Sequence, residues 1–153
     1  DHCGGLPDFP WAAVHVHRRE YEAFTGTMRR WTDMAYIQRH IAHVPNWVLY
    51  EDGDETWYDF SAIRLPFTPE MWLVPLHGHS QGHCGVAVKL EQGWYFNAGD
   101  AGAVYNHETP AWLIRLVLGP HDARLRQFMR QHPEVVLSNS HMFPEWFAHK
   151  VWD

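Results

Sequence analysis

The sequence predicts an α+β protein, because strand-like and helix-like apolar patterns follow one another along a single chain. Residues 72–76 and 84–90 are short apolar runs that end near glycine-containing turns, as buried strands do. Residues 120–132 give the clearest helix, with Pro120 near its start and Pro133 stopping it. A chain of 153 residues is one domain's worth and is long enough for a sizeable core.

The first third of the chain predicts one strand and two helices. Residues 12–17 alternate around β-branched valines, which predicts a short strand. Residues 18–24 fit one or two helical turns, and Gly26 is a stop signal. Apolar residues at helical spacing over 28–44 predict a second helix, which Pro45 ends.

The middle of the chain carries a turn signal between two apolar runs. Asp52-Gly53-Asp54 separates residues 46–51 from residues 56–60, and this arrangement predicts a β-hairpin. Further strands are expected over 62–65, 71–76, 85–90, 94–97 and 135–137, and further helices over 110–118 and 144–151.

Composition and charge exclude several classes of partner. The chain has 12 basic and 18 acidic side chains, a net charge of −6 without a basic stripe, which argues against a nucleic-acid partner. No apolar run approaches the ~20 residues of a membrane span. Two cysteines, Cys3 and Cys84, make no disulfide framework, so we expect a reducing compartment, the cytoplasm. We therefore expect neither a nucleic-acid nor a membrane partner, and the oligomeric state stays open.

The chemistry-bearing residues stand where predicted strands end. Gly78-His79-Ser80-Gln81-Gly82-His83 follows one strand, and Gly99-Asp100 follows the strand over 94–97. Glycine-rich turns at strand ends can hold side chains out over a cleft. Imidazole and carboxylate together are typical ligands of zinc-like ions. The pattern therefore predicts a metal site.

This pattern resembles the third and fourth metal motifs of the metallo-β-lactamase-fold hydrolases. Asp1-His2 is similar to the last half of that family's His-x-His-x-Asp-His motif, and His141 falls where the family keeps its final metal histidine. The resemblance covers essentially all of residues 1–153 and implies the C-terminal portion of a metallo-β-lactamase domain. The order of elements is compatible with one half, and a little more, of a four-layer αββα sandwich. We therefore expect the chain to lack part of the N-terminal half and upstream sequence to be missing.

The resemblance also implies a small-molecule substrate, a reaction and a set of metal ligands. In this family two metal ions, zinc with iron or manganese as alternatives, share a bridging carboxylate and a bridging water that attacks an ester, lactone, thioester or amide. By motif, Asp100 is the bridging carboxylate, His79 binds the first ion, and Asp1, His2 and His141 bind the second. Asp1 and Asp100 are the implied catalytic carboxylates. Because two histidines of the first site would stand upstream of Asp1, the chain as given is expected to be inactive and its intact parent to be a hydrolase.

Alternatives stay open for the residues and for the function. Asp100 is read alternatively as a turn residue, and many of the thirteen histidines are ordinary surface or core residues. We expect His83 to fix the turn by hydrogen bonding rather than to bind metal, and the role of His77 is undecided. The alternative function is a truncated, non-catalytic member of the same fold that binds a metal or ligand without turnover.

Overall fold

The computed structural model describes residues 2–26, 36–42, 46–102 and 110–140. The chain divides into two compact units, Asp1–Glu51 with Ser80–Gly82, and Asp52–His79 with His83–Asp153. The predicted α+β class is confirmed, since both helices and strands occur. Among the described residues, no helix has both the length and the apolar character needed to cross a membrane.

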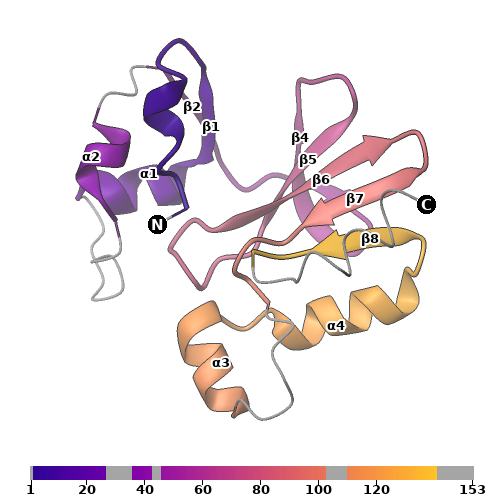
Figure 1. The fold of residues 1–153 in the computed structure, drawn as a ribbon. Coiled ribbons are helices and arrows are strands. Elements are labelled where there is room, and N and C mark those ends of the chain that lie inside the picture. Colours follow the sequence, from indigo (N-terminus) through magenta and orange to yellow (C-terminus); the bar gives the residue numbers. More distant parts are fainter. Residues whose placement is uncertain (1, 27–35, 43–45, 103–109, 141–153) are drawn as a thin grey trace. The chain divides into compact units, whose positions relative to one another are not determined.

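The first unit contains a two-stranded parallel sheet and short helices (Figure 1). Strand β1 pairs with β2, and α1 follows β1 directly. Gly26 ends α1 in a left-handed conformation at φ 93°, as its sequence predicts. The elements are η1 (Leu6–Asp8), β1 (Val14–His17), α1 (Arg18–Thr25), α2 (Gln38–Ile41) and β2 (Trp47–Tyr50).

Aromatic packing and one carboxylate hold the first unit together. Phe24 of α1 lies 5.0 Å from Trp47 of β2 between ring centroids and 6.2 Å from Tyr36. Glu20 of α1 accepts hydrogen bonds from the Tyr36 hydroxyl at 2.9 Å and from the Gly82 N–H at 2.7 Å. This carboxylate therefore ties α1 to two segments that lie far from it in the sequence.

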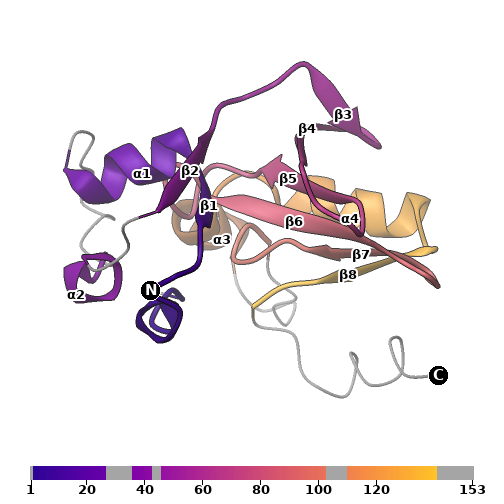
Figure 2. The ribbon, with the colours of Figure 1, turned by 90° about the horizontal axis from the view of Figure 1, so that it is seen from above.

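The second unit is built on a six-stranded sheet in the order β3-β4-β5-β6-β7-β8. Neighbouring strands are antiparallel except for β7 and β8, which are parallel because α3 and α4 connect them. Figures 1 and 2 show α4 along one face of this sheet. The elements are β3 (Glu55–Trp57), β4 (Phe60–Leu65), β5 (Met71–Pro75), β6 (Cys84–Leu90), β7 (Gly93–Asn97), α3 (Ala111–Leu118), α4 (Asp122–Gln131) and β8 (Val135–Ser138).

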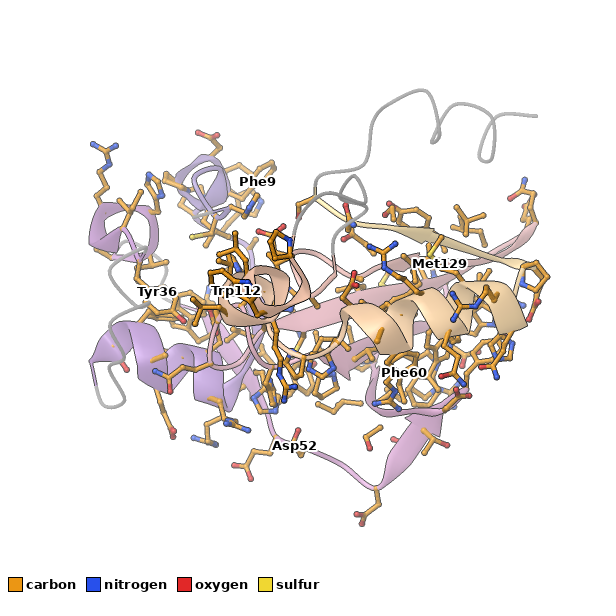
Figure 3. The ribbon with its side chains drawn as sticks, turned by 90° about the horizontal axis from the view of Figure 1, so that it is seen from below. Phe9, Tyr36, Asp52, Phe60, Trp112 and Met129 are labelled. Atoms are coloured by element: carbon orange, nitrogen blue, oxygen red, sulfur yellow. The ribbon has the colours of Figure 1, made fainter. Side chains whose placement is uncertain are left out.

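The core of the second unit is aromatic. Phe128 of α4 is 1% exposed, and its ring lies 5.2 Å from Phe60 and 5.5 Å from Trp57 between centroids. Phe96 of β7 joins the same cluster at 4.9 Å from Trp57. In Figure 3 the side chains of Phe60 and Met129 lie beside α4, and Met129 packs against this core. The sheet is thus fixed against α4 on the face that carries these rings.

Two sequence-based expectations about elements need correction. The hairpin over 46–51 and 56–60 does not form, because β2 pairs in parallel with β1 and β3 pairs with β4. The turn that closes β3 onto β4 is at Tyr58, which has φ 49°. In the expected helix over 28–44, the described residues are helical only in α2. The expected helix over 144–151 lies outside the described residues.

We predict that replacing Phe128 with alanine lowers the free energy of unfolding by about 3–5 kcal/mol, because it empties the middle of an aromatic core. Urea unfolding followed by circular dichroism measures the change. Phe67→Ala is the matched control, since Phe67 is 40% exposed and its loss is expected to cost less than about 1 kcal/mol. Equal losses from the two variants would contradict the assigned core.

Candidate metal centre

The loop after β5 is closed at its base by backbone contacts. The Leu76 N–H donates to the His83 carbonyl at 2.9 Å, and His77 Nδ1 donates to the same oxygen at 3.2 Å. Leu76 is fully buried, which anchors the start of the loop in the core. The Nε2 atom of His77 lies 3.6 Å from a carboxylate oxygen of Asp52. His77, whose role the sequence left undecided, therefore helps to close the loop that carries His79.

His79 and Asp100 come together at the ends of two different strands. Nε2 of His79 lies 3.3 Å from Oδ2 of Asp100, and the Asp100 side chain is 4% exposed. Nδ1 of His79 lies 3.1 Å from the Val117 carbonyl, which can only accept, so Nδ1 carries the proton of that bond. In neutral His79 the Nε2 lone pair therefore faces a carboxylate oxygen.

This pair of donor atoms fits a shared cation. Two lone pairs at such a distance repel each other unless a proton or a metal ion lies beside both. Ligand bonds of about 2.0–2.2 Å at a tetrahedral angle place two zinc ligands roughly 3.3 Å apart. The observed separation of His79 and Asp100 matches this value. The donor set present in the second unit is therefore suited to a zinc-like ion.

His83 supports the backbone of Asp100. Its Nε2 accepts a hydrogen bond from the Asp100 N–H at 3.1 Å, so this nitrogen is engaged and carries no proton. A Cβ atom on Gly99 would lie only 2.6 Å from the imidazole, and Gly99 has φ 55°, so only glycine suits this turn. The hydrogen-bonding role expected for His83 agrees with this geometry.

Burial lowers the pKa of His83 to about 4, with the nearby His79 as the next contribution. Within the part of the chain that the structure describes, no hydrogen-bond partner reaches the buried Nδ1 of His83. His83 is therefore held neutral near pH 7. Its contribution to the free energy of unfolding decreases as the pH falls below that range.

The turn that presents Asp100 is held by the parallel pair β7 and β8. Asn97 Oδ1 accepts from the Gly99 N–H at 2.8 Å, and the Ala98 N–H donates to the Ser138 carbonyl at 2.9 Å. The Ser140 N–H then donates to the Gly99 carbonyl at 3.2 Å. The described chain after β8 thus reaches the Asp100 turn at the residue before His141.

The structure does not test the other sequence-predicted ligands. Asp1 and His141 lie outside them, and His2 is an exposed residue of the first unit. Their roles as metal ligands stay predictions. His79 and Asp100 are adjacent, while their binding of metal also stays a prediction.

Sequence reasoning missed the segment from Val117 to His121. His121, read as an ordinary histidine, donates from Nε2 to the His77 carbonyl at 2.9 Å, and burial lowers its pKa. Val117 supplies the carbonyl that binds His79. The only local signal was the Gly119-Pro120 pair, which marks a break between two helices without showing what the break packs against.

The chain is similar in sequence to two curated proteins that are named probable metallo-hydrolases. The chain is 32% identical over 103 residues to a probable metallo-hydrolase of Mycobacterium bovis and to one of Mycobacterium tuberculosis, covering 66% of this chain and 33% of each relative. No family model matches the chain.

Solved structures show the fold. One is an N-acyl homoserine lactone hydrolase with the product N-hexanoyl-L-homoserine bound at its catalytic metal centre, with TM-score 0.64 and 22% identity over 99% of this chain and 56% of that one. A B. thuringiensis AiiA variant with N-decanoyl-L-homoserine at its active site gives the same values. A quorum-quenching N-acyl homoserine lactone lactonase gives TM-score 0.63 and 22% identity, over 99% and 58%. The chain thus spans a third of the curated relatives and little more than half of the solved chains.

We predict that the metal-free protein loses about 2–3 kcal/mol of stability through His83 as pH falls from about 6.5 to about 4. Stability falls with pH because, between these two pH values, His83 of the unfolded chain is protonated while buried His83 of the folded chain is not. Urea unfolding of the metal-free protein across this range measures it.

The variant His83→Gln is the comparison for this pH dependence, because its amide oxygen can accept from the Asp100 N–H and does not titrate. The difference in stability between the two proteins is expected to shrink as pH falls. Parallel stability curves for wild type and variant would show that His83 is not held neutral.

Proposed function

We propose that this chain, which has the metallo-β-lactamase fold, forms part of a metal-dependent hydrolase in which His79 and Asp100 bind the metal. The observation that carries the proposal is the 3.3 Å approach of His79 Nε2 to the buried carboxylate of Asp100. Asp1, His2 and His141 are proposed as the remaining ligands on the strength of their motifs. Zinc fits this nitrogen and oxygen donor set best, with iron and manganese as alternatives.

A bound zinc-like ion supplies Lewis acidity that brings the pKa of a bound water toward 7 and makes hydroxide available at neutral pH. The residues of this chain prepare the site. The Val117 carbonyl fixes the tautomer of His79, and the Asp100 peptide is held by His83. The neighbours Ala98 and Ala101 are fully buried, which keeps water away from the flanks of the Asp100 turn. The carboxylate is thereby kept dry and aimed at His79.

A small, uncharged carboxylic acid derivative is the proposed substrate class: an ester, lactone, thioester or amide. A lactone is the leading member, supported by the solved relatives whose names give N-acyl homoserine lactones as substrate or product. The net charge of −6 supports a small molecule over a nucleic acid.

We expect Asp100→Asn and His79→Ala, made in the protein that carries this chain, to lower kcat/KM for lactone hydrolysis at least roughly 100-fold. Even the loss of a group that only orients a metal ligand typically costs about 10–100-fold. Chelation should abolish the activity, and Zn²⁺, Fe²⁺ or Mn²⁺ added singly to the metal-free protein identifies the metal. Asp59→Asn is the matched control, since Asp59 is an exposed aspartate on the β3–β4 turn.

Full hydrolysis by the metal-free protein, or by both site variants, would overturn the proposal. Tight metal binding without hydrolysis of any lactone, ester, thioester or amide would instead support the non-catalytic alternative.

A further inference from the structure

The junction between α3 and α4 packs directly on the loop that carries His79, through two glycines. A Cβ atom on Gly78 would lie 2.6 Å from the Gly119 Cα, and one on Gly119 would lie 2.7 Å from the Gly78 Cα. Gly119 also has φ 87°, which side-chain-bearing residues rarely adopt. The two backbones can approach this closely only because both residues lack a side chain.

Two histidine hydrogen bonds cross this glycine contact in opposite directions. His79 of the loop donates to the Val117 carbonyl at 3.1 Å, and His121 of the junction donates to the His77 carbonyl at 2.9 Å. Each segment thus binds the other's backbone on either side of the Gly78–Gly119 contact. This reciprocal arrangement restrains both the position and the rotation of the loop.

Among the α3 side chains that the structure describes, burial is confined to the C-terminal end. Trp112, which Figure 3 labels on α3, is 69% exposed, and Leu116 and Val117 are 54% and 51% exposed. Burial begins only at the junction, where Leu118 is 2% exposed. Buried Leu118 and the close contact with the His79 loop thus both lie at the C-terminal end of this helix.

We propose that Gly119 and His121 are positioning residues, which hold the His77–His79 backbone so that Nε2 of His79 faces Asp100. Neither residue is a metal ligand. They act through His79, because the Val117 carbonyl can fix its tautomer only while the junction and the loop stay in register. This inference rests on the proposed function of His79 as a ligand.

The test compares the His121→Leu, His121→Gln and Gly119→Ala variants, made in the protein that carries this chain, by zinc affinity. Zinc dissociation constants come from competition with a chromophoric chelator, and the absorption spectrum of the Co²⁺ form reports ligand geometry. We expect His121→Leu and Gly119→Ala to weaken zinc binding roughly 10–100-fold and to alter the Co²⁺ spectrum. Because the glutamine amide can donate to the His77 carbonyl, His121→Gln should restore most of the affinity.

Two control variants separate positioning from general destabilisation. His132→Leu removes a histidine from the other end of α4, where it contacts Glu134 at 3.3 Å. Gly93→Ala introduces a side chain at φ 141°, where the nearest atom is 3.4 Å away. Thermal unfolding of every variant shows the loss of stability. The controls are expected to lose stability while keeping the wild-type zinc affinity.

Wild-type zinc affinity in both His121→Leu and Gly119→Ala, together with loss of binding in His79→Ala, would overturn the positioning role and leave the proposed function standing. Equal losses in His121→Gln and His121→Leu, or equal losses in the controls, would also overturn it. Wild-type affinity in His79→Ala would overturn the positioning role and the proposed function together.

Discussion

The second unit depends on one buried carboxylate. Asp100 is 4% exposed, and an ionised carboxylate so placed requires compensation from hydrogen bonds and a nearby positive charge. His83 fixes the Asp100 backbone by accepting from its peptide N–H, and Nε2 of His79 lies 3.3 Å from its oxygen, where a shared cation would balance the charge. The ends of β7 and β8 and the loop after β5 converge where this charge must be balanced, which is the physical basis for reading the location as a cation site.

Histidines of one sequence region acquire different tasks from their surroundings. His79 gives its Nδ1 proton to a carbonyl and presents Nε2 to a carboxylate, whereas His83 uses Nε2 as an acceptor and is kept neutral by burial. His121 donates from Nε2 to the backbone carbonyl of His77. The residue type sets the range of roles, and the partner on each ring nitrogen selects one of them.

Local patterns predicted most elements of the sheet but not all of their partners. The strands β5, β6 and β7 fall where expected, because an apolar run bounded by turn residues is visible in the local sequence. The strand β2 was assigned to the wrong partner. The turn at Asp52-Gly53-Asp54 indicates a reversal, yet β2 finds its hydrogen bonds with β1, some thirty residues earlier in the chain. Pairing is decided by which edges meet in space, and a turn signal cannot report that.

The sequence by itself determined that His79 and Asp100 follow predicted strands in glycine-containing turns, since glycines and the imidazole and carboxylate types are visible residue by residue. Only the tertiary structure decided that these two side chains meet, that His83 accepts from the Asp100 N–H, and that Gly119 and His121 contact the loop that carries His79. The His121 contact joins residues 44 positions apart. This contact depends on Gly78 and Gly119, whose backbones approach closely because neither has a side chain. The sequence around each glycine does not indicate that it packs against the other.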